Sequence, residues 1–187
     1  LLLLLRVLAI LCVALAVAGP HWGGLGTGGG TRSVLFVIDN SASMGTGQAV
    51  GTRLDEAVRV CAEMIAALPG ETAVQVLVGG SQTRAIFGDW LPAAAGAIGG
   101  LSLIQPTEGA FDQARVWTEA ARLVARAPGS PVQIVVLSDL QDVPPDEDWQ
   151  AAAQRLQEAG ESHLLVRRIG EPTAGGGVLA VALPARA

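Results

Sequence analysis

Two carboxylates and three hydroxyls in this chain are spaced as a set of oxygen ligands would be. The five residues are Asp39, Ser41, Ser43, Thr107 and Asp139. Asp39 and Asp139 each come just after an apolar run, where a carboxylate is costly unless it is paired or solvated. Ligation by oxygen alone favours hard cations, so the set predicts a site for Mg²⁺, or for Mn²⁺ or Ca²⁺ in its place.

The predicted site has a ligand set that does not complete the coordination of its ion. Two carboxylates and three hydroxyls leave a small divalent cation poorly neutralised, with water in its open positions. A carboxylate from another molecule is the natural occupant of such a position. The pattern therefore predicts metal-dependent binding of a protein partner with an exposed Asp or Glu, and it assigns no catalytic residue.

Two other functions remain open for the same residues. Asp39 and Asp139 on a parallel sheet could serve Mg²⁺-dependent phosphoryl transfer, with an aspartate as the nucleophile. That chemistry needs a basic group beside the metal, whereas the chain has no lysine and its candidate loops hold no arginine before Arg53. The other alternative is a structural scaffold whose site no longer binds metal. Metal affinity and phosphoester turnover distinguish the three functions.

Alternating apolar runs and amphipathic segments must position these residues. Strands are expected at 34–38, 73–78, 83–87, 132–137, 163–169 and 178–183, and helices at 53–68, 91–101, 111–127 and 144–159. This alternation predicts right-handed crossovers and a mainly parallel sheet with both faces covered. The fold class is therefore α/β, a three-layer α/β/α sandwich of Rossmann-like type. Ligands of such sheets bind outside the carboxyl ends of the strands, where the candidate residues fall.

One helix makes a specific prediction about burial. For the segment 111–127, helical spacing places an apolar stripe opposite a charged one. The residues expected to be buried are Phe111, Ala114, Trp117, Ala121 and Val124.

The first twenty residues predict a transmembrane helix. Leu1 to Ala18 is apolar except for Arg6, and about 20 apolar residues span a bilayer as a helix. Pro20 would end the helix, and Trp22 stands where an interfacial aromatic would lie. A secretory signal peptide and a helix buried in a soluble core are the alternatives.

Residues 21–32 then read as a glycine-rich linker, and residues 33–187 as the α/β domain. We expect the domain to be held at a membrane. Arg6 favours its external or periplasmic side by the positive-inside rule, although Arg32 on the other flank weakens that argument.

Charge and cysteine content exclude some classes of function. The formal charge is −5, and the 12 basic residues are all arginines spread along the chain. No basic patch is therefore expected, and nucleic acid is not an expected partner. Cys12 and Cys61 lack the spacing of a zinc site or of a disulfide framework, so both are expected to be small buried hydrophobes.

The candidate ligands resemble a known motif. Asp39-x-Ser41-x-Ser43, followed by Thr107 and by Asp139 after a buried strand, resembles the metal-ion-dependent adhesion site of von Willebrand factor type A domains. The resemblance covers roughly residues 33–183. It implies that the two serines bind the metal directly, that Thr107 binds directly or through water, and that the two aspartates bind mostly through water.

A narrower resemblance is to bacterial Bat-type, aerotolerance-related membrane proteins. It rests on the apolar segment with its early arginine, on the run from Val34 to Met44, and on Leu137 to Gln141. It implies a membrane helix before the domain and, by analogy only, a MoxR-type AAA+ ATPase system as a possible partner. The chain departs from the pattern at Leu140, where many such domains have glycine, and at Glu108-Gly109.

Overall fold

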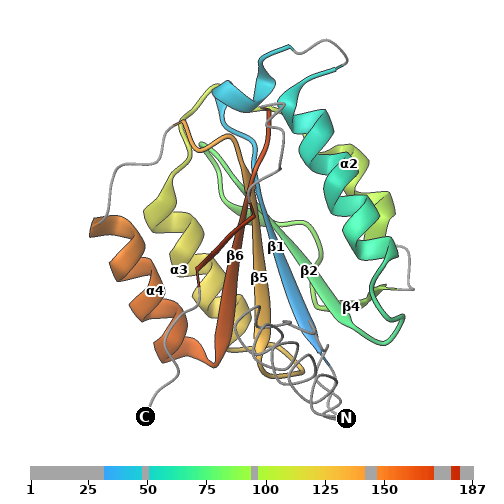
Figure 1. The fold of residues 1–187 in the computed structure, drawn as a ribbon, viewed down its shortest axis with the longest axis vertical. Coiled ribbons are helices and arrows are strands. Elements are labelled where there is room, and N and C mark those ends of the chain that lie inside the picture. Colours follow the sequence, from blue (N-terminus) through green and yellow to red (C-terminus); the bar gives the residue numbers. More distant parts are fainter. Residues whose placement is uncertain (1–31, 48–50, 94–96, 142–146, 171–177, 182–187) are drawn as a thin grey trace, which may run out of the picture.

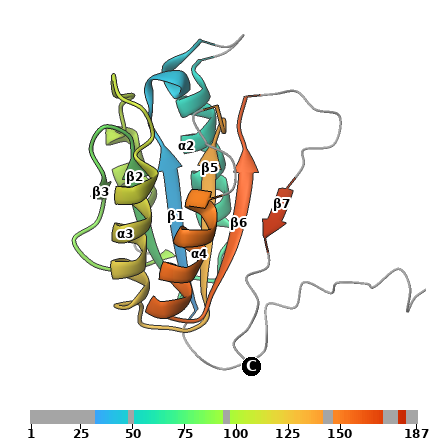
Figure 2. The same cartoon turned by 90° about the vertical axis from the view of Figure 1, so that its left-hand side faces the viewer.

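The computed structural model describes residues 32–47, 51–93, 97–141, 147–170 and 178–181 of the chain. These residues form a seven-stranded sheet covered by helices on both faces (Figures 1 and 2). In this part of the chain, no helix combines the length and apolar character needed to cross a membrane. The predicted transmembrane helix at 1–20 lies outside the described residues, as does the linker at 21–32 except for Arg32.

The sheet is mainly parallel, as the sequence predicts. Its strands are β1 (Ser33–Asp39), β2 (Ala73–Gly79), β3 (Arg84–Ala85), β4 (Leu91–Pro92), β5 (Val132–Ser138), β6 (Ser162–Arg168) and β7 (Val178–Val181). The order is β3-β2-β1-β5-β6-β7, and β4 pairs with β2 beside β3. The four long strands β2, β1, β5 and β6 are parallel to one another, whereas β3, β4 and β7 are antiparallel to their neighbours.

Helices cover the two faces of the sheet separately. They are α2 (Arg53–Ala66), α3 (Gln113–Val124) and α4 (Glu147–Ala159), with short 3₁₀ segments η1 (Ala42–Gly45) and η3 (Ala97–Leu103). Helix α2 lies on one face, and α3 and α4 lie side by side on the other (Figure 1). The described residues therefore form the predicted three-layer α/β/α sandwich.

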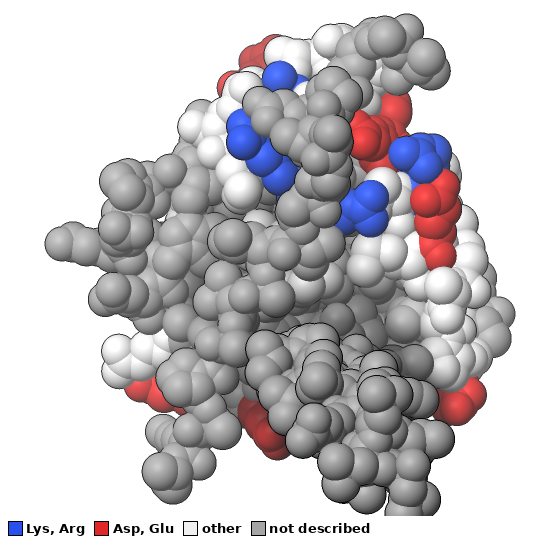
Figure 3. Space-filling model, viewed as in Figure 1, with Lys and Arg blue, Asp and Glu red and all other residues white. Residues whose placement is uncertain are grey.

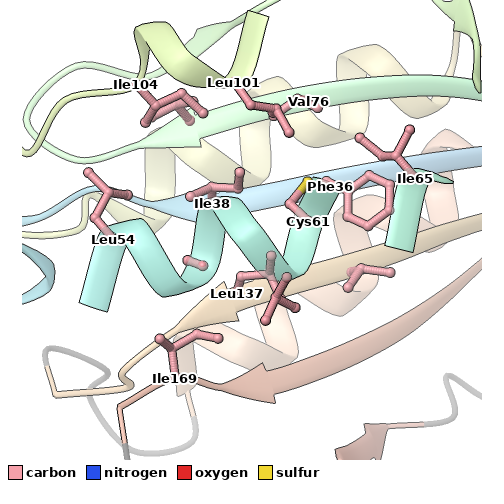
Figure 4. Packing of buried hydrophobic residues seen from close by; sticks show 14 of the residues in the cluster. Phe36, Ile38, Leu54, Cys61, Ile65, Val76, Leu101, Ile104, Leu137 and Ile169 are labelled. Carbon is pink, nitrogen blue, oxygen red and sulfur yellow. The ribbon is translucent and has the colours of Figure 1, made fainter. Parts of the chain in front are cut away.

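The core on the α2 face joins that helix to the four central strands. Leu54, Cys61 and Ile65 of α2 pack over Phe36 and Leu137 of the sheet (Figure 4). All are almost fully buried, including the Cys61 thiol, so the prediction for Cys61 is confirmed. Cys12 lies outside the described residues. Burial of the four larger side chains, those other than Cys61, stabilises the fold by roughly 1.5–3 kcal/mol each before the entropy cost of folding.

Helix α2 begins with a capping box. The Thr52 hydroxyl accepts a hydrogen bond from the Asp55 backbone N–H, and the Asp55 carboxylate accepts one from the Thr52 backbone N–H. Together these bonds satisfy two of the amide groups that a helix start leaves without partners. The hydrogen bonds from Thr52 also hold the pKa of Asp55 below its ordinary value. The first turn of α2 is thus fixed at the edge of the sheet.

The buried stripe of α3 differs in part from the prediction. Ala114 is exposed and Ala121 is half-buried. The residues that pack on the sheet are Phe111, Val116, Trp117, Ala120, Leu123 and Val124. The helix begins at Gln113, capped by the Asp112 side chain, and turns its larger apolar residues Val116 and Leu123 inward in place of two alanines. Burying the larger side chains removes more apolar area from water.

The helix expected at 91–101 is also wrong in part. Leu91 and Pro92 pair antiparallel with β2, and the helical segment is the 3₁₀ turn η3. Pro92 is tolerated there because it lacks only its own N–H, and a short edge strand can spare that donor. The backbone N–H of Ala93 donates to the Thr72 carbonyl and continues the pairing.

Candidate metal-binding site

The candidate ligands lie at the carboxyl edge of the sheet, where the strand order changes direction. β1 is central, and the chain leads from it to β2 on one side and β5 on the other. Asp39 is the last residue of β1, and Asp139 directly follows β5. Parallel strands bring these two ends side by side, and the loop of Ser41 and Ser43 rises between them. This is the switch point at which open α/β sheets bind ligands.

Asp39 is buried beneath the loop, and each of its two carboxylate oxygens accepts a hydrogen bond. The Ser138 hydroxyl donates to Oδ2 over 2.6 Å, and the Ser41 backbone N–H donates to Oδ1 over 2.8 Å. Burial raises the pKa of Asp39; the hydrogen bonds from Ser138 and Ser41 oppose the rise, and the nearby charge of Asp139 adds to it. Asp39 is therefore a costly buried carboxylate whose charge would be stabilised by a cation.

Three oxygens converge above Asp39. Ser41 Oγ and Ser43 Oγ are 3.1 Å apart, and Ser43 Oγ is 3.2 Å from Asp139 Oδ1. Neighbouring ligands of an octahedral Mg²⁺ with bonds of about 2.1 Å are about 3.0 Å apart. The spacing and chemistry of these oxygens therefore fit a small hard cation. Ser41 and Asp139 are buried, while Ser43 is partly exposed at the mouth.

Thr107 lies beside this group but its hydroxyl is engaged elsewhere. Thr107 Oγ1 donates to the Asn40 carbonyl over 3.0 Å, and the Thr107 backbone N–H donates to the same carbonyl over 2.8 Å. The Ser81 N–H donates to Oγ1 over 3.4 Å. The structure thus brings four of the five predicted ligands into one network, and holds the fifth in the adjoining loop. A side chain at Gly80 would come within 2.5 Å of Thr107 Oγ1, so this loop needs glycine there.

A basic side chain lies at the site, contrary to the sequence argument. Arg53 Nη1 is 2.7 Å from Asp139 Oδ2, and the two side chains are 22% and 3% exposed. The sequence places Arg53 only at a helix start. In the fold, the start of α2 lies over the carboxyl edge of the sheet and carries the guanidinium to Asp139. The absence of a basic group therefore no longer counts against phosphoryl transfer.

Sequence reasoning also missed two residues that support the ligands. Ser138 holds Asp39, and its Oγ accepts from the Leu140 N–H over 3.0 Å. Asn40 links two loops, because its side-chain amide donates to the Gln105 carbonyl over 2.8 Å. In the sequence, the only indication of these supporting roles is that Ser138 directly precedes Asp139 and Asn40 directly follows Asp39. Leu140 has φ 58°, a left-handed conformation that glycine adopts without strain, which explains a preference for glycine at this position.

Within the described residues, no cluster of three or more His, Cys, Asp and Glu side chains could hold a metal. A cation at this edge of the sheet would therefore depend on two carboxylates together with hydroxyl oxygens. Such a set suits Mg²⁺, Mn²⁺ or Ca²⁺ and not zinc, which prefers nitrogen and sulfur ligands.

The fold agrees with the sequence comparison. The profile of the von Willebrand factor type A domain matches residues 34–141, more than half of the chain and the segment that contains all five candidate ligands. The chain therefore belongs to the von Willebrand factor type A domain family. Among curated proteins, none matches the chain significantly by sequence.

Solved structures show the same fold at low sequence identity. A von Willebrand factor type A protein from Catenulispora acidiphila is 21% identical with a TM-score of 0.63; the match covers 76% of this chain and 34% of that one. BatB from Bacteroides thetaiotaomicron is 18% identical with a TM-score of 0.59, over 82% and 81% of the two chains. An aerotolerance-related membrane protein from Bacteroides fragilis NCTC 9343, with multiple mutations to serines, is 19% identical with a TM-score of 0.53, over 81% and 82%. This chain thus spans about a third of the first protein and most of the other two.

Proposed function

We propose that this domain binds a protein partner through a divalent metal held at the carboxyl edge of its sheet. The observation that carries the proposal is the convergence of Ser41 Oγ, Ser43 Oγ and Asp139 Oδ1 above the buried Asp39. These residues would hold Mg²⁺, and Thr107 would join them directly or through water. The bound ion would supply an open coordination position for a carboxylate. Domains of this family generally serve in adhesion or as scaffolds, which supports binding over catalysis.

The charge around the site favours an acidic partner. Arg167 and Arg168 end β6, are exposed, and lie in register with Leu137 and Ser138 just before Asp139. Arg53 approaches the same edge from α2. In the view of Figure 3, arginine side chains lie in the upper half of the molecule, the end at which the parallel strands finish, with Asp and Glu side chains among them. Positive charge at the rim would steer a partner's Asp or Glu toward the metal.

The proposal also includes the cellular location of the domain. Two structural neighbours are a Bat protein and an aerotolerance-related membrane protein. Their likeness, together with the apolar segment 1–20, supports a domain tethered to a membrane and working on its external or periplasmic side. A MoxR-type ATPase system as partner rests on family analogy alone.

One observation favours the scaffold alternative. Arg53 already neutralises Asp139, so the fold does not need a metal to satisfy that carboxylate. If the scaffold hypothesis is right, the purified chain binds no divalent metal at millimolar concentration.

A binding assay with a defined acidic probe tests the proposal. The 187-residue chain is passed over immobilised poly-glutamate and poly-glutamine peptides, first with Mg²⁺ and then with a chelator. We expect binding to poly-glutamate only, lost on chelation and in Ser43→Ala, a variant that leaves every formal charge unchanged. Ser102→Ala, an exposed serine whose hydroxyl donates to the Gly99 carbonyl, is the matched control and should bind like the parent. Binding that survives both the chelator and Ser43→Ala would overturn the proposal.

A further inference from the structure

We propose that Arg53 is an internal counter-cation that weakens metal binding by the free domain and couples it to capture of an acidic partner. This inference rests on the proposed metal-dependent function. It assigns Arg53 a role in setting affinity, with no direct contact to the metal.

The position of Arg53 at the start of α2 does not stabilise that helix. Arg53 is the first residue of α2, where the positive end of the helix dipole disfavours a cation. Its charge instead meets Asp139 Oδ2 at 2.7 Å in a largely buried ion pair. The stem of the side chain lies against Gly170, where an added Cβ would approach Arg53 Cδ to 2.9 Å. The Arg53 side chain therefore lies between the start of α2 and the residues that follow β6.

The two oxygens of Asp139 are divided between different partners. Oδ2 accepts from Arg53, while Oδ1 accepts from the Ser43 hydroxyl and from the Gln141 N–H, each over 3.2 Å. Oδ1 is thus the oxygen of Asp139 that lies beside the Ser43 hydroxyl, whereas Oδ2 is the oxygen that Arg53 contacts. Arg53 orients Asp139 and at the same time reduces the negative charge that attracts a cation.

The sum of formal charges at the site explains how Arg53 would couple metal binding to the binding of a partner's carboxylate. Asp39, Asp139 and Arg53 together carry −1, and a divalent metal would change this sum to +1. A partner's carboxylate would bring it to zero. Without Arg53 the metal alone would neutralise the two aspartates, so the metal would bind more tightly and the carboxylate would gain less. At separations of several ångströms, one added positive charge beside a divalent ion should weaken its binding by roughly tenfold.

Mn²⁺ binding measured by electron paramagnetic resonance tests the role of Arg53 in the 187-residue chain, with acetate as the carboxylate probe. In the parent we expect weak Mn²⁺ binding that acetate strengthens. In Arg53→Gln and Arg53→Met we expect binding about tenfold tighter without acetate and a smaller response to acetate. Arg53→Lys keeps the charge and should resemble the parent, and Arg59→Gln, which removes an exposed ion pair on the same helix, should leave Mn²⁺ affinity unchanged.

The direction in which Mn²⁺ affinity changes in the neutral variants distinguishes this role of Arg53 from a merely structural one. If Arg53 only positioned Asp139, both neutral variants would bind Mn²⁺ more weakly than the parent, and that result would overturn the inference. Unchanged affinity and unchanged acetate response in both would also overturn it. If neither the parent nor the neutral variants bind Mn²⁺ at millimolar concentration, the proposed function itself fails, and this inference fails with it. Mn²⁺ binding by the neutral variants without acetate, together with binding by the parent only when acetate is present, would support the inference most strongly.

Discussion

Ser138→Ala removes the strongest hydrogen bond to the buried Asp39 carboxylate, and its effect can be worked out from the structure. The Ser138 hydroxyl donates to Asp39 Oδ2 over 2.6 Å and accepts from the Leu140 N–H over 3.0 Å. A hydrogen bond to a charged group contributes about 1.5–3 kcal/mol, and a neutral one about 1 kcal/mol. We therefore expect the free energy of unfolding at neutral pH to fall by about 2.5–4 kcal/mol, a large share of the roughly 5–15 kcal/mol of a typical domain.

The pH dependence of this loss identifies its cause. Because burial raises the pKa of Asp39, its protonation favours the folded state. That contribution is complete below the ordinary value of 3.8 and is lost as the pH rises through the raised, folded-state pKa. Without Ser138 that pKa rises further, so the difference between parent and variant should grow between the two folded-state pKa values. Toward acid pH only a neutral hydrogen bond is lost, and the destabilisation should shrink by roughly 1 kcal/mol.

Urea unfolding of the 187-residue chain, without metal and across a series from about pH 8 to about pH 4, measures this difference. Ser102→Ala makes the same chemical change at an exposed site and should alter stability by less than about 0.5 kcal/mol. A Ser138→Ala loss that is equal at all pH values would refute the argument that a charged Asp39 carboxylate is being stabilised. A loss below about 0.5 kcal/mol at neutral pH would do the same.

Three further predictions concern the loops and the core. Gly80→Ala should lower the free energy of unfolding in urea by about 1–3 kcal/mol, because its Cβ would collide with the Thr107 hydroxyl. Gly88→Ala is the control, because its Cβ would meet nothing within 4 Å, and it should leave stability nearly unchanged. Equal effects of the two substitutions would contradict the argument. Leu140→Gly should be more stable than Leu140→Ala by about 1 kcal/mol, because only glycine relieves the left-handed backbone at φ 58°; the opposite order would show that the strain is absent. Cys61 should resist alkylation by iodoacetamide in the folded chain near pH 8, because burial raises the pKa of its thiol to about 12. Peptide mass spectrometry should find Cys61 alkylated only in urea. Rapid labelling of the native chain would contradict the burial of this thiol.

The central strands could be predicted from sequence because each is an apolar run with one physical explanation. The runs around Phe36 and Val135 are short and rich in β-branched residues, which favours strands buried on both faces over helices. Gln75 interrupts the run of β2, and the structure accounts for it: its amide donates to the Phe87 and Asp89 carbonyls and holds the adjoining loop. The strand ends then placed Asp39 and Asp139 together, because parallel neighbours finish at one edge of the sheet.

The parts that sequence could not supply depend on tertiary contacts. The ion pair of Arg53 with Asp139 joins residues 86 positions apart, and nothing local to either residue indicates it. The orientation of the Thr107 hydroxyl depends on the Asn40 carbonyl, which only the folded loops bring near. The sequence does not distinguish the edge strand at Leu91 and Pro92 from the start of a helix, because short segments at a sheet edge carry no periodic signal.

Calorimetric titration of Mg²⁺ into the 187-residue chain, beside Asp39→Asn and Ser43→Ala, is the most direct test of the central claim. The account predicts saturable binding to a single site in the parent, lost or strongly weakened in both variants, because the first removes the buried charge and the second removes a ligand oxygen without changing charge. Absence of Mg²⁺ binding by the parent at millimolar concentration, with or without acetate, would contradict it. So would binding that both variants retain.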